Sequence, residues 1–248
     1  VHDISHTAFS HLADQIYERK DQTFHEDHHE RFVEEYKLDG LVEEHGYNAD
    51  YIFDEDNFTV LERERPDICA DRLDYTLRDL YKYGAITKEE VQEILNGLTV
   101  ENGVIVAENE NIAHRIMDFF MTLNRDVFFN EEHEAAGMLL VEVLKDAIER
   151  GVIDEEDLFK NDEQVIEKIR QDDKLSNDLD AINPDIKIEK DANHDRYESM
   201  RKHRIVDTLV EDTGKRLSDL DESANEKFRS FKEGVPLKQR YSIKTESK

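Results

Sequence analysis

Residues 1–14 read VHDISHTAFSHLAD and open with an adjacent His2–Asp3 pair, which His6 follows. If this stretch is helical, His2 and His6 share one face, because residues four apart are neighbours on a helix. Imidazole and carboxylate groups together form a ligand set for a divalent transition metal. The opening stretch therefore predicts a metal site near the start of a helix.

Further candidates for chemistry follow within the first 37 residues, which are predicted to be helical. His11 and His25 are available for proton transfer, since imidazole titrates near neutral pH. The apolar side chains of Phe9, Leu12 and Ile16 recur at helical spacing and give this segment a face to bury.

A second segment, residues 67–84 (DICADRLDYTLRDLYKYG), also predicts a helix. Asp71, Tyr75 and Asp79 are spaced by four and lie on one face of it. The other face is apolar and should be the core side; it consists of Leu73, Leu77 and Leu80.

We expect His2, Asp3 and Asp71 to meet at one metal if their two helices pack side by side. Nitrogen and oxygen ligands suit Mn²⁺, Fe²⁺, Zn²⁺ or Ni²⁺, whereas Mg²⁺ suits an oxygen-only site better. The identity of the metal stays open among these five. Such a metal lowers the pKa of a bound water and polarises a phosphoryl oxygen.

The rest of the chain predicts a mainly α fold with one β-hairpin. Thr87 and Glu90 form a capping box, and Asn102-Gly103 predicts a type I′ turn between two short strands. Long apolar helices are expected at 109–129 and 131–150. We expect a helical domain over 1–170 and a small α+β appendage over 171–248, which begins with a polar linker.

Composition limits the partners of the chain. It has 61 acidic residues against 33 lysines and arginines, for a net charge of −28. Such a field repels nucleic acid and anionic membranes, so neither is expected as a partner. The single cysteine, Cys69, forbids an internal disulfide and fits a cytoplasmic location; we expect it to be a small buried apolar residue.

Three runs together carry a family resemblance: HDISHTAFSH, then FHED, then CADRLDYTLRDL. They resemble the HD-domain phosphohydrolase superfamily, and in particular the branch that includes deoxynucleoside triphosphate triphosphohydrolases. The likeness covers about residues 1–150 and is weaker in the appendage. It implies an HD-type helical bundle and a homo-oligomer that hydrolyses a small nucleotide with the help of a divalent metal.

The resemblance also implies roles for single residues. His2, Asp3 and Asp71 match the metal ligands of the family. His6 and His11 would line the catalytic pocket, with Asp14 orienting a histidine and His25 acting near the scissile phosphate, where it could serve as general acid.

On the second helix, the resemblance implies that Tyr75 and Asp79 contact the sugar of a nucleotide. Arg72 stands where the triphosphohydrolases carry a cation that contacts phosphate. The other phosphate-binding cations of that branch do not align, and Arg125 is the candidate that remains.

One departure concerns the start of the chain. The family carries its first metal histidine on a helix upstream of the HD pair. We therefore expect the sequence to be an N-terminally incomplete HD domain whose metal site lacks one ligand, so that this piece could be inactive.

Three readings remain. The first is a metal-dependent phosphohydrolase acting on nucleotides, with deoxynucleoside triphosphates as the preferred class. The second is a phosphomonoesterase or cyclic-nucleotide phosphodiesterase of the same fold, which differs in its product. The third is a non-catalytic regulatory or assembly module, for which metal need not copurify and Asp71→Ala should have no effect.

Overall fold

The computed structural model describes residues 3–19, 21, 23–184, 186–191 and 197–244. The described chain is 55% helical with a few small sheets, which confirms the mainly α class. Residue contacts divide it into two compact units. Unit 1 comprises Val1–Phe53, Glu131–Glu198 and Arg240–Lys248, and unit 2 comprises Asp54–Asn130 and Ser199–Gln239. The boundary expected at residue 171 stays a prediction.

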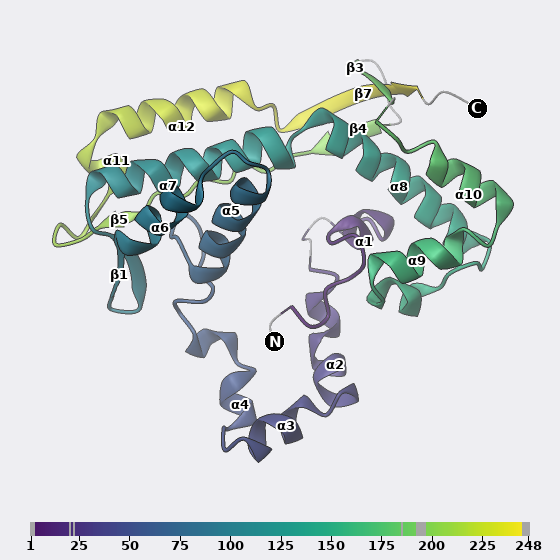
Figure 1. Ribbon diagram of the computed structural model, residues 1–248, viewed down its shortest axis with the longest axis horizontal. Coiled ribbons are helices and arrows are strands. Elements are labelled where there is room, and N and C mark those ends of the chain that lie inside the picture. The colour runs from purple at the N-terminus through teal and green to yellow at the C-terminus, as the bar shows by residue number, and fades with distance from the viewer. Residues whose placement is uncertain (1–2, 20, 22, 185, 192–196, 245–248) are drawn as a thin grey trace. The chain divides into compact units, whose positions relative to one another are not determined.

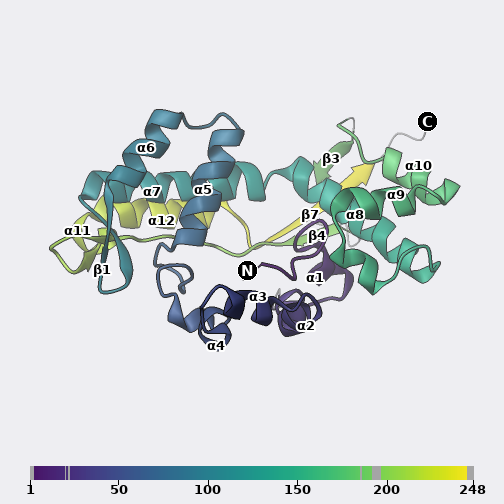
Figure 2. The same ribbon diagram turned by 60° about the horizontal axis from the view of Figure 1, so that its bottom comes forward.

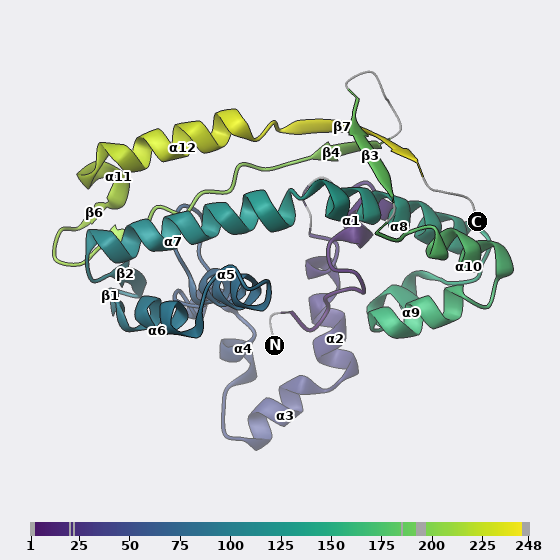
Figure 3. The same cartoon turned by 45° about the horizontal axis from the view of Figure 1, so that its top comes forward.

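Unit 2 is organised around the helix α7 (Glu110–Leu123), which a π-helical turn, η3 (Asn124–Phe128), extends. Figures 1 and 3 show α7 between α12 (Glu222–Gly234) on one side and α5 (Ala70–Lys82) and α6 (Lys88–Asn96) on the other. Two shorter helices complete the unit: η2 (Glu55–Asn57) and α11 (Leu217–Leu220). The core side chains that are at most 2% exposed include Leu80, Ile94, Ile116 and Phe120.

The helix α5 carries its polar and apolar faces as the sequence predicts, but it begins at Ala70 rather than near Asp67. Its predicted core side chains are buried: Leu73, Leu77 and Leu80. The capping box of Thr87 and Glu90 is present at the start of α6, where each residue bonds the backbone N–H of the other.

A four-stranded sheet in unit 2 has the order β1-β2-β5-β6. Its strands are β1 (Leu98–Glu101), β2 (Val104–Ala107), β5 (Leu209–Val210) and β6 (Lys215–Arg216). The strands β1 and β2 form the predicted antiparallel hairpin. Asn102 and Gly103 have φ angles of 50° and 76°, and a type I′ turn requires positive φ at both residues.

Unit 1 is organised around α8 (Glu131–Glu149), which contacts α1 (Leu12–Ile16) and α10 (Asp173–Asp180). Figure 2 shows α1 beside α8. The remaining helices are η1 (Glu26–His28), α2 (His29–Glu35), α3 (Leu38–Glu44), α4 (Ala49–Ile52), η4 (Glu155–Phe159) and α9 (Asp162–Ile169). The core of the unit includes Leu144, Leu158, Ile169 and Leu175.

Among the described residues, the helix predicted for residues 1–37 is wrong from Asp3 to the beginning of α1, and it is interrupted again between α1 and η1, where Glu18 has a φ angle of 56°. Phe9 and Ser10 have φ angles of 57° and 55°, which a right-handed helix cannot contain. The backbone N–H of Ala8 donates to the Leu158 carbonyl oxygen at 2.7 Å, and that of Phe9 donates to Asp162 Oδ1 at 2.9 Å. Because these distant partners take the backbone donors, residues 3–10 form turns instead.

The linker expected from residue 171 is also wrong in part, because α10 lies within it. The side chain of Asp172 accepts hydrogen bonds from the backbone N–H groups of Lys174 and Leu175 and caps the helix. Leu175 and Leu179 are buried in the core of unit 1. Two buried leucines one turn apart therefore anchor this short polar helix in the core.

A three-stranded sheet follows, with the order β3-β7-β4. Its strands are β3 (Lys187–Lys190), β4 (Tyr197–Met200) and β7 (Lys238–Lys244). The strands β3 and β7 are antiparallel, and Ile188 pairs with Ile243. Within the part of the chain that the structure describes, no helix is both long and apolar enough to cross a membrane.

Candidate functional site

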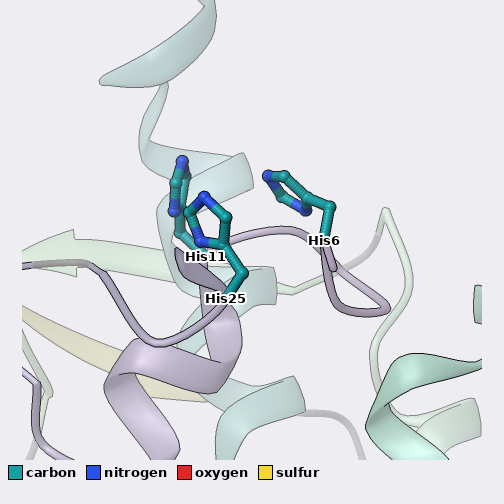
Figure 4. Close-up of side chains that lie close together, drawn as sticks. All are labelled: His6, His11 and His25. Carbon is teal, nitrogen blue, oxygen red and sulfur yellow. The ribbon is translucent and has the colours of Figure 1, made fainter. Parts of the chain in front are cut away.

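Three histidine side chains of unit 1 converge on one point, as Figure 4 shows. The ring centroids of His6 and His25 lie 4.7 Å apart in a stacked arrangement. The His11 ring lies 5.4 Å from that of His6 and 5.5 Å from that of His25. One nitrogen from each ring lies within 4.8 Å of the others. The structure therefore brings together three of the four residues predicted to be catalytic.

Each histidine comes from an irregular segment, and two of the three directly precede a helix. His6 lies in a turn that its own N–H closes on the Asp3 carbonyl oxygen at 3.0 Å. His11 immediately precedes α1, and His25 immediately precedes η1. The helix ends fix the backbone, while the turns let the three rings approach from different directions.

Asp14, the fourth residue predicted to be catalytic, connects two of these segments. Its side chain is 3% exposed. Oδ2 lies 3.3 Å from Nδ1 of His11, and Oδ1 accepts the backbone N–H of Phe24 at 3.0 Å. One buried carboxylate thus orients His11 and also ties the residue before His25 to α1.

The electrostatics of two members of the cluster, His11 and His25, favour the neutral imidazole. Burial lowers the pKa of His11, and the neighbouring His6 lowers it further, although the hydrogen bond to Asp14 opposes this change. Burial and His6 also lower the pKa of His25. About half of the His11 side chain is exposed, so water limits these effects. Neutral imidazole can accept a proton or bind a metal, and protonated imidazole can do neither.

The donor set fits a divalent metal such as Zn²⁺, Fe²⁺ or Mn²⁺, for which imidazole nitrogen is a common ligand. In a tetrahedral zinc site the Zn–N bonds are about 2.1 Å, so the nitrogens lie about 3.4 Å apart. The three histidine nitrogens, within 4.8 Å of one another, would have to close by about 1.4 Å at most. Rotation about side-chain torsions can supply this movement.

The predicted metal site of His2, Asp3 and Asp71 stays a prediction. His2 lies outside the described residues, and Asp3 is exposed at the start of unit 1. Asp71 is half-buried in the first turn of α5 and belongs to unit 2.

Arg72, predicted to contact phosphate, is only 6% exposed and holds the loop before α5. Its guanidinium donates to the carbonyl oxygens of Arg63 and Asp67 at 3.2 and 2.9 Å, and to Glu62 Oε1 at 3.2 Å. It also lies 3.1 Å from Sγ of Cys69, whose thiol is buried and has a raised pKa because of that burial. These bonds give Arg72 a structural use beside any contact with substrate.

The other predicted substrate residues also lie in unit 2. Asp71, Tyr75 and Asp79 are all half-buried, as expected for residues on one face of α5. The Tyr75 ring lies 6.2 Å from that of Phe128. Arg125, in η3, is 60% exposed and forms an ion pair with the neighbouring Asp126. Their contacts with a nucleotide stay predictions.

Sequence reasoning missed the residues that hold the histidine-bearing loop from a distance. Asp162 lies 153 residues from Phe9, whose N–H it accepts, and Leu158 holds Ala8 in the same way. A lone aspartate at the start of a helix has the pattern of a cap, so no local signal marks this second role.

No protein-family model matches the chain. The chain is 33% identical over 214 residues to the uncharacterized protein YdhJ of Bacillus subtilis. The aligned residues make up 85% of this chain and 66% of YdhJ. It is 29% identical over 167 residues to the metal-dependent phosphohydrolase cns2 of Cordyceps militaris. The aligned residues make up 64% of this chain and 48% of cns2. The chain therefore spans about two thirds and about half of these relatives. The second similarity supports the resemblance at the level of a metal-dependent phosphohydrolase.

Proposed function

We propose that this chain is a metal-dependent phosphohydrolase that acts on nucleotides, with deoxynucleoside triphosphates as its substrate class. The observation that carries the proposal is the convergence of His6, His11 and His25 beside the buried carboxylate of Asp14. The similarity to cns2 supports the reaction class. The nucleotide substrate and the HD-type bundle rest on the sequence motifs.

In this proposal His11 is the residue that moves a proton. Because its Nδ1 faces Asp14, Nε2 is the ring nitrogen left to face a substrate. The lowered pKa keeps His11 in the form that accepts a proton at neutral pH. Asp14 would stabilise the imidazolium that results, since an ionised acceptor makes the stronger hydrogen bond.

His6 and His25 would hold the divalent metal, or would place a phosphate that a metal on the predicted HD pair binds. In both arrangements Nε2 of His11 is kept for the proton. In either case the metal supplies Lewis-acid polarisation of a phosphoryl oxygen. The two arrangements differ in one measurable respect: only the first loses bound metal when His25 is replaced.

The test measures metal content and hydrolysis on the same samples of the full chain. Single variants His11→Ala and His25→Ala are compared with His45→Ala, which changes the exposed histidine that directly follows α3 in the same unit. Metal retained after dialysis is measured by mass spectrometry. Hydrolysis of a nucleotide panel with Mn²⁺ is followed by its product: inorganic triphosphate, phosphate or a ring-opened monophosphate.

We expect His11→Ala and His25→Ala to lower hydrolysis by at least about a hundredfold, the usual contribution of general acid–base catalysis. His45→Ala should match the parent chain. Inorganic triphosphate as product supports the triphosphohydrolase assignment, whereas phosphate or a ring-opened product replaces it by one of the two enzyme alternatives. Unchanged metal content and unchanged hydrolysis in both cluster variants would refute the site.

The homo-oligomer that the resemblance implies is also a proposal. Light scattering coupled to size-exclusion chromatography measures it directly. A monomer at micromolar concentration would contradict it.

A further inference from the structure

The segment between His6 and His11 has a strained backbone, and this strain lies next to the histidine cluster. Phe9 and Ser10 have φ angles of 57° and 55°, in the left-handed region that residues other than glycine rarely adopt. Such residues persist only where surrounding contacts hold them, and they gather at functional sites. The contacts that hold this turn are therefore candidates for a role in the reaction.

Local hydrogen bonds close the turn but do not fix its place in unit 1. The Thr7 hydroxyl donates to the Ser10 carbonyl oxygen at 2.8 Å, and the Ser10 N–H donates to the Thr7 carbonyl oxygen at 3.2 Å. Both bonds join residues that are three apart, so the turn can move as one body and keep them. The place of the histidines on either side of it depends on bonds to other elements.

Two consecutive N–H groups of the turn are held by η4 and by the first residue of α9. The Ala8 N–H donates to the Leu158 carbonyl oxygen at 2.7 Å, and the Phe9 N–H donates to Asp162 Oδ1 at 2.9 Å. Ala8 and Leu158 are 4% and 1% exposed, so the first of these bonds lies in the core of the unit. The second bond is made by a side chain, which a single substitution can remove.

The carboxylate of Asp162 is not the cap of its own helix. Asn161 caps α9, because its side chain accepts the Gln164 N–H at 2.9 Å and its N–H donates to the Gln164 side chain at 3.3 Å. Asp162 and Glu163 each place a carboxylate in the first turn, where the helix dipole favours negative charge. Glu163 shares this general use, and the bond to Phe9 is what distinguishes Asp162.

We propose that Asp162 is a positioning residue of the histidine cluster. Its carboxylate anchors the left-handed turn at Phe9 and so sets the approach of the His6 ring to the His11 ring, whose centroids lie 5.4 Å apart. This role rests on the function proposed above, because the cluster carries the reaction that Asp162 supports. Without its acceptor the strained turn relaxes and moves His6, and a displacement of about 1 Å at a reacting group can cost about a hundredfold in rate.

The test uses four variants of the full chain. Asp162→Ala removes the acceptor of the Phe9 N–H, and Asp162→Asn keeps an oxygen for it. Glu163→Ala is the matched control, because it removes one exposed carboxylate from the same turn of α9. The fourth variant combines Asp162→Ala with Ser10→Gly, since glycine adopts a left-handed φ without a steric penalty and both bonds to Thr7 use the Ser10 backbone.

Steady-state hydrolysis gives kcat and KM for each variant. We expect Asp162→Ala to lower kcat at least about tenfold and kcat/KM by the same factor, since a misplaced histidine acts in the transition state rather than on substrate binding. Asp162→Asn and Glu163→Ala should match the parent chain. Ser10→Gly should restore most of the rate that Asp162→Ala loses, because it removes the strain that Asp162 opposes.

Proton NMR of the histidine rings in EDTA gives a second readout, which needs neither metal nor activity. Each aromatic ring shifts the resonances of protons near it, so the His6 and His11 signals depend on the distance between the two rings. These signals should move in Asp162→Ala and should keep their parent positions in Asp162→Asn and Glu163→Ala. Circular dichroism checks that each variant is folded.

Three results would overturn the proposal: parent-like His6 and His11 resonances in a folded Asp162→Ala variant, an equal loss of kcat in Glu163→Ala, or a loss in Asp162→Ala that Ser10→Gly leaves unchanged. The proposed function can fail separately. A parent chain that hydrolyses no nucleotide refutes the reaction, whereas moved ring resonances in Asp162→Ala still show that Asp162 positions the rings.

Discussion

The carboxylate of Asp14 has two separable uses, and two substitutions distinguish them. Asp14→Ala removes both the partner of His11 and the acceptor of the Phe24 N–H. Phe24 is 6% exposed, so its N–H is left buried without that acceptor. Such a loss costs about 1–3 kcal/mol, and for a chain of this length each kcal/mol lowers the Tm by roughly 2–4 °C.

Asp14→Asn keeps one oxygen for the Phe24 N–H and turns an amide NH₂ toward Nδ1 of His11. Nδ1 must then accept rather than donate, so the proton of the ring moves to Nε2. Stability should stay within about 1 kcal/mol of the parent chain, because the buried N–H keeps its partner. Hydrolysis should fall as far as in His11→Ala, because Nε2 no longer accepts a proton.

Thermal and urea unfolding followed by circular dichroism measure the stability of both variants, since the chain contains no tryptophan to report by fluorescence. Nitrogen-15 NMR of the histidine rings reports the tautomer of His11. An Asp14→Ala variant as stable as the parent would refute the structural use. An Asp14→Asn variant with an unchanged His11 tautomer would refute the orienting use.

Three further predictions follow from other parts of the chain. In EDTA, the free energy of unfolding should be greatest above the ordinary histidine pKa of 6.5 and should fall as the pH drops toward about 5. The reason is that burial lowers the pKa of His11 and His25 in the folded chain, so the unfolded chain takes up protons first. Urea unfolding at several pH values measures this, and a flat profile would contradict it. Leu144→Ala, which empties a fully buried position of α8, should cost about 2–5 kcal/mol in the same assay, whereas a loss below about 1 kcal/mol would mean that the core is not packed as described. Asp71→Ala should lower the amount of bound metal if Asp71 is a ligand. Asp74→Ala, which changes an exposed aspartate three residues further along the same helix, should not. Equal metal content in both variants would show that Asp71 is not a ligand.

Most helices of the chain could be predicted from local pattern alone. The spacing of Leu73, Leu77 and Leu80 locates the buried face of α5, and the capping box at Thr87 locates the start of α6. The turn at Asn102-Gly103 has the backbone angles that its two residues favour. These features succeed because a helix face, a cap or a tight turn depends on residues within a few positions of one another.

The turn that carries His6 could not be predicted in this way. Its histidine spacing resembles that of a helix, yet backbone bonds to the distant Leu158 and Asp162 fold it differently. The same holds for α10, where the burial of Leu175 in a core made by other helices outweighs a polar local sequence. In both cases tertiary partners decide between local conformations that differ little in free energy.

The sequence by itself determined which side chains can carry out chemistry: the histidines, Asp14 and the acidic face of α5 are all visible in the printed letters. Only the tertiary structure decided that His6, His11 and His25 meet. The physical reason is that spacing along the chain governs neighbours only within a turn or a strand. The approach of remote side chains depends instead on how apolar faces pack and on which distant groups satisfy the backbone.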